Sequence, residues 1–144
     1  MKNANLITCI IAEPGREARV ERIENSSLEA LQKIVGGYIE FFYPFDDNIA
    51  ILCNEEGKIN GEPLNRAIRD EDGDIVDIVA GTFFVCGLGE EDFASLPKEL
   101  QAKYAEKFRQ PESFLKLGSR IVAIPMEPAK PSPAKDKSAL GEER

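Results

Sequence analysis

The stretch LQKIVGGYIE, residues 31–40, decides the fold because it contains the end of a helix, a turn and the start of a strand. The spacing of the apolar residues before the glycines predicts a helix over about residues 27–35. Ser26 is a suitable N-cap for this helix, and Glu29, three residues later, is the partner expected in a capping box. The apolar residues that share one face of the helix are Leu28, Leu31, Ile34 and Val35.

Two glycines and an aromatic run follow this helix. Gly36 or Gly37 can adopt the left-handed conformation that closes a helix, so we interpret the pair as a structural turn. Residues 38–43 are mostly aromatic or β-branched, which predicts a strand directly after the turn.

Apolar runs bounded by turn residues predict further elements on both sides of this unit. A last helix, capped by Ser95, is indicated by apolar residues that recur every four positions up to Phe108. For residues 63–69 we favour a short helix that opens at Pro63. The remaining strands are expected at residues 6–12, 18–23, 49–53, 75–80, 82–86 and 120–124.

This order of elements predicts an α+β fold, with a mainly antiparallel sheet of five or six strands and two or three helices packed on one face. The length of 144 residues suits a single domain, which we place at residues 1–124. Residues 125–144 are rich in proline and lysine and are expected to form a disordered tail with polyproline II bias.

The composition excludes several kinds of chemistry. The chain has no histidine, which removes Ser–His–Asp and Cys–His catalysis and histidine metal ligands. Cys9, Cys53 and Cys86 each lie in an apolar run, so we expect buried, reduced thiols in a cytoplasmic protein. The net charge of −8 disfavours direct nucleic-acid binding, and no apolar run is long enough to cross a membrane.

Two short motifs do not fit the sites that they suggest. Residues 70–74 alternate aspartates as a calcium loop does, but Ile75 and Gly81 occupy the places where such a loop needs glycine and glutamate. We therefore interpret them as a charged turn. The glycines at 87–89 are too few for a dinucleotide fingerprint, and a phosphate-binding loop is absent. We expect no cofactor and no metal.

The pair Asn65 and Arg66 is the most specific polar feature, since arginine suits planar or anionic partners. In the helix favoured for this segment, Leu64 and Ile68 face the core and leave the pair more exposed. The alternative is that Arg66 forms a surface ion pair with Asp70 or Asp72.

Several segments resemble an uncharacterised domain family of Firmicutes, their conjugative elements and phages. The segments are AEPGREARVERIE, LQKIVGGYIE, NEEGKINGEPLNR and DIVAGTFFVCGLGEEDF, and the resemblance covers roughly residues 6–110. It implies an accessory protein of a mobile element and brings no activity or ligand with it. The residues that match the family are Gly36, Gly37, Asn65, Arg66, Gly81, Thr82 and Phe83.

The leading hypothesis is a cytoplasmic, non-enzymatic accessory protein of a mobile element or its host. It would bind a host protein or a small anionic ligand through Asn65, Arg66, Gly81 and Thr82. The main alternative is an acidic protein that mimics DNA and inhibits restriction or other defence enzymes, because the chain carries an excess of carboxylates. An enzyme of unrecognised type is the third hypothesis.

Overall fold

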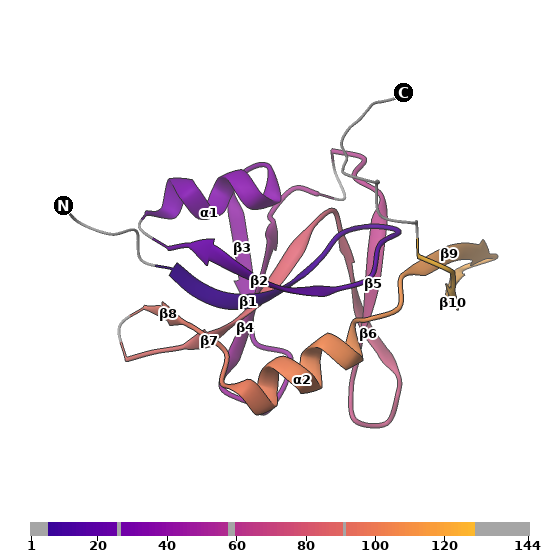
Figure 1. The fold of residues 1–144 in the computed structure, drawn as a ribbon. Helices are drawn as coiled ribbons and strands as arrows, with labels where there is room; N and C mark the ends of the chain where they lie inside the picture. The colour runs from indigo at the N-terminus through magenta and orange to yellow at the C-terminus, as the bar shows by residue number, and fades with distance from the viewer. Residues whose placement is uncertain (1–5, 26, 58–59, 91, 129–144) are drawn as a thin grey trace, which may run out of the picture.

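A computed structural model describes residues 6–25, 27–57, 60–90 and 92–128 (Figure 1). The described residues form ten strands and two helices. In chain order these are β1 (Leu6–Ala12), β2 (Arg19–Glu24), α1 (Leu28–Val35), β3 (Ile39–Phe42), β4 (Ile49–Asn54), β5 (Leu64–Arg69), β6 (Ile75–Ala80), β7 (Phe83–Leu88), β8 (Phe93–Ala94), α2 (Lys98–Lys107), β9 (Glu112–Leu117) and β10 (Arg120–Pro125).

The main sheet has six antiparallel strands, which confirms the predicted α+β class. Its order is β2-β1-β7-β4-β3, and β8 pairs with one end of β7. The strands β1, β4 and β7 lie inside the sheet and are almost entirely buried, as their continuous apolar runs indicate. β2 and β3 are the two edges.

The two helices cover opposite faces of this sheet, so the prediction that they pack on one face is wrong. Along β7, Phe83 and Val85 join a core with Tyr104 of α2. The alternate residues of the same strand join a second core with Leu31 of α1. Figure 1 shows α1 above the strands and α2 below them. A sheet buried on both faces explains why β4 and β7 lack polar alternation.

Residues 64–69 form strand β5, and the short helix predicted there is wrong. β5 pairs with β6 in a separate two-stranded sheet, and Ile68 and Val79 pack it against the α2 face of the main sheet. Pro63 therefore precedes a strand, where its missing N–H is tolerated. Pairing with β6 across the turn at 70–74 overrides the local preference for helix.

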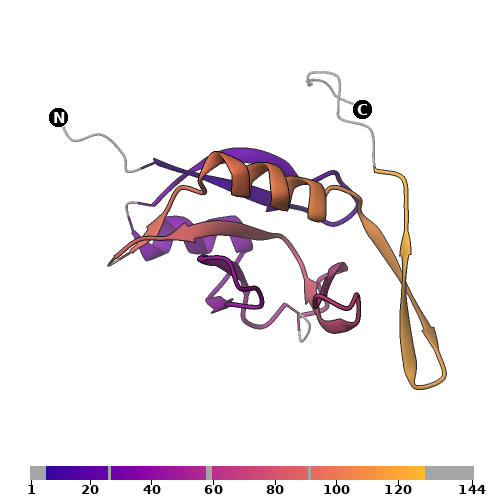
Figure 2. The same cartoon turned by 90° about the horizontal axis from the view of Figure 1, so that it is seen from below.

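The strands β9 and β10 form a third sheet, a hairpin that projects from the rest of the molecule (Figure 2). The strand predicted at residues 120–124 is present as β10, and it pairs with β9 rather than with a strand of the main sheet. β10 includes Pro125, and the N–H of Met126 donates a hydrogen bond to the oxygen of Pro111. The rest of the predicted tail, residues 129–144, lies outside the described residues.

Both ends of α1 are capped by residue types that the sequence predicts, but the N-cap lies one residue later than expected. Ser27 is the N-cap, because its hydroxyl accepts a hydrogen bond from the N–H of Ala30. The predicted cap, Ser26, lies outside the described residues. Gly36 closes the helix with a left-handed φ of 83°, and its N–H bonds the oxygen of Gln32.

Gly37 is needed for a different reason. A Cβ at this position would lie 2.8 Å from Nδ2 of Asn54, which donates a hydrogen bond to the oxygen of Val35. The two glycines therefore form the structural turn that the sequence predicts, one through its conformation and the other through close packing. Among the described residues, no helix is long and apolar enough to span a membrane.

Candidate functional site

Asn65 and Arg66 are buried, so their predicted exposure is wrong. Asn65 is 0% exposed and Arg66 is 1% exposed. The pairing of β5 with β6 shifts register between Leu64 and Arg66, which is the signature of a β-bulge. The irregularity lies at Asn65 and locally breaks the alternation of a regular strand, which accounts for two consecutive polar side chains inside the fold.

Hydrogen bonds to the main chain satisfy this buried pair. Asn65 Nδ2 donates to the oxygens of Ala12, at 2.9 Å, and Gly81, at 2.8 Å. Its side-chain oxygen accepts a 2.8 Å bond from Nη1 of Arg66. The guanidinium also donates to the oxygens of Phe108 and Arg16. The pair thus joins β1, the turn after it, the turn before β7 and the end of α2.

Burial lowers the pKa of Arg66 to about 10, and the nearby carboxylate of Glu112 opposes this shift. The guanidinium is therefore still charged at neutral pH. Because its donors point to main-chain oxygens inside the protein, the geometry favours a structural role. The binding role of Asn65 and Arg66 stays a prediction, and their burial does not favour it.

Gly81 and Thr82, the other predicted binding residues, lie beside this pair. Gly81 has a left-handed φ of 78°, and its N–H bonds the oxygen of Pro63. Thr82 is half-buried, and Phe83 packs edge-to-face against Phe108. The structure thus places Arg66 and Gly81 in contact with Asn65 inside the protein. Thr82 lies at the edge of this group.

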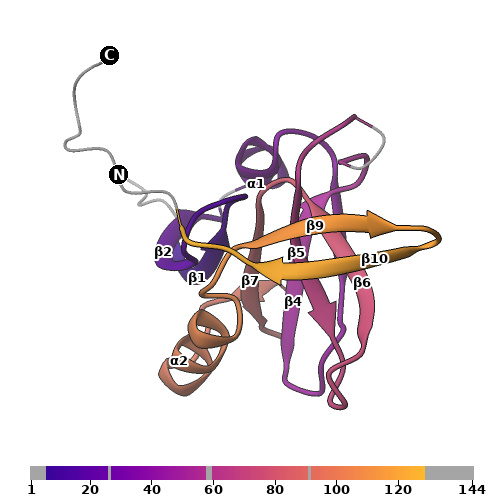
Figure 3. The same ribbon diagram turned by 90° about the vertical axis from the view of Figure 1, so that its right-hand side faces the viewer.

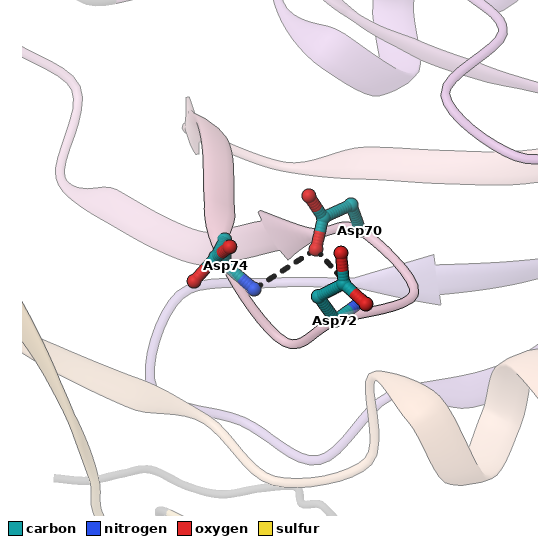
Figure 4. Close-up of side chains that lie close together, drawn as sticks. All are labelled: Asp70, Asp72 and Asp74. Atoms are coloured by element: carbon teal, nitrogen blue, oxygen red, sulfur yellow. Dashed lines mark hydrogen bonds between the residues drawn. The ribbon is translucent and has the colours of Figure 1, made fainter.

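The acidic turn, residues 70–74, is closed by its own first residue (Figure 4). Oδ1 of Asp70 accepts hydrogen bonds from the N–H groups of Asp72, at 3.0 Å, and Asp74, at 2.9 Å. Within the part of the chain that the structure describes, Asp70, Asp72 and Asp74 are the group whose carboxylates could surround a metal ion. All three are exposed, and their arrangement is explained by the turn itself.

A cavity of about 450 Å³ lies between the acidic turn, the loop after β3 and α2. Inside it, Asp47 accepts hydrogen bonds from Lys103 and from the hydroxyl of Tyr104, and these two partners lower the pKa of Asp47. Its wall carries more acids than bases, which does not favour an anionic ligand. The charged residues are Asp46, Asp47, Asp70, Glu71 and Asp72, with Arg69, Lys103 and Lys107.

The edge strand β3 carries an exposed aromatic surface. Phe41 is 50% exposed and Tyr43 is 55% exposed, and their rings pack edge-to-face at 6.1 Å. Phe41 also packs edge-to-face against Phe93 of β8, at 5.8 Å. We call these three residues the aromatic surface. It lies on the α1 face, where Ile39 of β3 contacts the core.

The outer edge of β3 has no partner strand among the described residues. The oxygen of Tyr38 bonds the N–H of Glu55 in the neighbouring chain segment. Since the bonding direction alternates along an antiparallel strand, Glu40 and Phe42 also face β4. The main-chain groups of Ile39 and Phe41 consequently point outward, where they can pair with an added strand.

A second cavity, of about 270 Å³, lies on the other face of β3, between β3 and β6. Glu40 and Phe42 of β3 line it, together with Glu55 and Asp77. The β3 edge therefore has aromatic rings on one face and a carboxylate-lined groove on the other. The sequence predicted the strand, but the position of β3 at the edge comes from the sheet order alone.

A family model, that of the domain of unknown function DUF3846, matches residues 7–109. The chain belongs to this family. No curated protein and no solved structure matches the chain. Membership of a family of unknown function agrees with the resemblance seen in the sequence, whereas its association with Firmicutes and mobile elements stays a prediction.

The DUF3846 region begins at β1 and extends just beyond α2. It thus contains the main sheet, both helices, the buried pair of β5 and the β3 edge. The β9–β10 hairpin, residues 112–125, lies outside the match. The β3 edge is consequently part of the region that matches the family.

Proposed function

We propose that the chain is a non-enzymatic accessory protein that binds an extended segment of another protein along the β3 edge. The observation that carries the proposal is the outward-facing main chain of Ile39 and Phe41, flanked by the aromatic surface and by the acidic groove. Strand addition of this kind takes affinity from main-chain hydrogen bonds and specificity from pockets for alternate side chains.

The two faces of β3 define the partner's chemistry. Side chains of an added strand alternate between the faces. On the α1 face they would meet Phe41, Tyr43 and Phe93, which favours apolar or aromatic groups. On the opposite face they would lie beside Glu40 and Glu55, which favours lysine or arginine. The expected ligand is an extended segment in which apolar and basic residues alternate.

This proposal retains the expected context of the protein, a cytoplasmic partner-binding protein of a mobile element or its host. Two other hypotheses have less support. The acidic cavity beside Tyr104 does not favour the small anionic ligand. The DNA mimic rests on the net charge of −8, and no further observation on the described residues favours it.

Selection of random linear peptides displayed on phage against the immobilised full chain tests the proposal. Selected peptides should alternate apolar and basic residues, and they should perturb the amide resonances of Ile39 and Phe41. Binding should be lost when Phe41→Ser and Tyr43→Ser are combined, because the apolar contacts disappear.

Val20→Ser is the matched control, because Val20 is an exposed apolar residue on the opposite edge strand, β2. This variant should bind the selected peptides as the wild type does. Circular dichroism of all variants would establish that the fold is intact. Peptides that bind the Phe41 and Tyr43 variant normally, or that perturb only resonances elsewhere, would contradict the proposal.

A further inference from the structure

The β9–β10 hairpin, which we call the arm, carries an uncovered apolar face. Cross-strand partners point to the same side, so Leu115 and Val122 share a face with Ile124 and Leu117. Leu117 is 55% exposed and Leu115 is 48% exposed. A two-stranded sheet in water needs a further layer to be stable on its own. The arm therefore has an apolar face without a cover in the single chain.

The base of the arm is fixed to β5. The carboxylate of Glu112 accepts hydrogen bonds from the N–H of Ala67, at 2.8 Å, and from Arg69, at 2.7 Å. This anchoring sets the direction in which the arm leaves the molecule (Figure 3). The carboxylate of Glu112 is thus paired at the base of the arm. The charged side chains near the tip of the arm are those of Lys116 and Arg120.

The tip of the arm is basic and apolar in an acidic protein. Lys116 and Arg120 flank the turn at Gly118, which has a left-handed φ of 63°. Both side chains are exposed, and among the described residues neither has an ion-pair partner. Leu117 and Ile121 lie next to them and are also exposed.

The β5–β6 hairpin presents the opposite combination. The acidic turn contains four carboxylates and no basic residue. Ile75 and Val76, directly after it, are exposed apolar residues of β6, and Val76 is 59% exposed. Within the described residues, none of the carboxylates of the turn forms an ion pair. The tip of the arm and the acidic turn are thus complementary in charge and in apolar character.

One chain does not bring the two surfaces together. The arm crosses in front of β5 and β6, so its tip and the acidic turn point in different directions (Figure 3). The base of the arm is already bonded to Arg69, directly before the turn, which holds this orientation. Contact between the two surfaces therefore requires another molecule.

We propose that two copies of this chain form a reciprocal dimer, in which the arm of each lies against the β5–β6 hairpin of the other. A two-fold axis satisfies both contacts at once, because the same two surfaces meet twice. Arg120, on the same face of the arm as Leu115 and Leu117, faces the acidic turn of the second copy, with Lys116 beside it at the tip on the other face. Leu115 and Leu117 cover Ile75 and Val76. This dimer uses neither the β3 edge nor the aromatic surface, so it is independent of the function proposed above.

A charge-exchange experiment on the full chain tests the dimer by sedimentation equilibrium. The arm variant combines Lys116→Glu with Arg120→Glu, and the turn variant combines Asp72→Lys with Asp74→Lys. Asp70 is left unchanged because it closes the turn. The dissociation constant of each variant alone should rise by about tenfold or more, since like charges then face each other.

Mixing the two variants restores opposite charges at both contacts, so an equimolar mixture should dimerise as the wild type does. The control combines Arg22→Glu with Lys98→Glu, which changes the net charge as much as the arm variant but alters exposed residues of β2 and α2. It should remain dimeric. Circular dichroism checks that every variant is folded.

Four results would overturn the proposal. The first is a wild-type chain that stays monomeric at all accessible concentrations. The second is an arm variant that dimerises normally, and the third is a mixture of the two variants that stays monomeric. Loss of the dimer on Phe41→Ser would also overturn it, because that result would place the contact at the β3 edge.

Discussion

The Nε atom of Arg66 donates a 2.9 Å hydrogen bond to the main-chain oxygen of Phe108, the residue that ends α2. The same guanidinium donates a 2.7 Å bond to the oxygen of Arg16, in the turn after β1. A single side chain on β5 thus holds the end of a helix and a distant turn together. The hydrogen bonds lie inside the protein, where their loss cannot be compensated by water.

Arg66→Ala should therefore lower the free energy of unfolding by about 3 kcal/mol or more, because it leaves several buried acceptors without donors. Arg66→Lys should restore little of this loss, since an ammonium group cannot reproduce the planar fork of donors. Urea denaturation followed by circular dichroism measures both effects. Arg22→Ala, at an exposed position, should change stability by no more than about 0.5 kcal/mol. Equal stability of the Arg66 and Arg22 variants would contradict the structural role.

Gly36 and Gly37 should respond differently to alanine. Gly36→Ala places a Cβ at a left-handed φ of 83° and should cost about 1 kcal/mol, although the space around it is open. Gly37→Ala places a Cβ against Nδ2 of Asn54 and displaces the amide that bonds the oxygen of Val35.

A double-mutant cycle with Asn54→Ala separates the two causes. In that background the cost of Gly37→Ala should fall, because the clashing amide is gone, whereas the cost of Gly36→Ala should stay the same. Thermal and urea unfolding of the single and double variants provide the free energies. A cost of Gly37→Ala that does not depend on Asn54 would show that the close approach is unimportant.

Much of the fold could be predicted from local patterns. The strands at residues 6–12, 49–53 and 75–80 follow from apolar runs with clear turn residues on each side. The placement of the two helices on opposite faces could not be predicted from the sequence, because it depends on which side of the sheet the chain crosses. Nor could the order of the strands, which puts β3 at an edge and makes its aromatic residues available.

Two hairpins were missed although the sequence contained a signal for each. Residues 64–69 and 75–80 are short runs on either side of a turn that contains Gly73, which is a hairpin pattern. Residues 112–117 and 120–125 are separated by Gly118 and Ser119, a typical two-residue connection.

The buried pair was harder to foresee. Asn65 and Arg66 are polar, which normally indicates exposure, and only the three-dimensional contacts show that main-chain oxygens from four segments surround them.

The three cysteines should be unreactive in the native protein, as their burial now supports. The hydrogen bond between Cys9 and Cys86, together with burial, raises the pKa of the Cys9 thiol. A thiol reagent should therefore label Cys9, Cys53 and Cys86 slowly in buffer and rapidly in urea. Mass spectrometry of the timed reaction gives the rates at each position. Rapid modification of all three under native conditions would show that the central strands open readily.

Tyr104 should make the stability of the protein sensitive to alkaline pH. Its side chain is buried, and its hydroxyl donates a 2.7 Å hydrogen bond to Asp47. Burial raises the pKa of Tyr104 above the ordinary value of about 10, and the hydrogen bond to the carboxylate of Asp47 raises it further. Since the folded state holds this proton more tightly than the unfolded state, the stabilisation is complete below about pH 10. It is lost as the pH rises toward the folded-state pKa.

Tyr104→Phe should therefore be less stable than the wild type at neutral pH by about 1 kcal/mol, the value of one hydrogen bond. As the pH rises beyond about 10, the wild type should lose stability faster than the variant, because only the wild type gains an ionised phenol on unfolding. The difference in the free energy of unfolding between the wild type and Tyr104→Phe should narrow and then reverse. Leu100→Ala on the same helix is the control, since it removes apolar packing and should lower stability by a constant amount. Urea unfolding of the three proteins in a series of alkaline buffers measures the effect, and a constant difference between Tyr104→Phe and wild type would show that the proton on Tyr104 does not contribute.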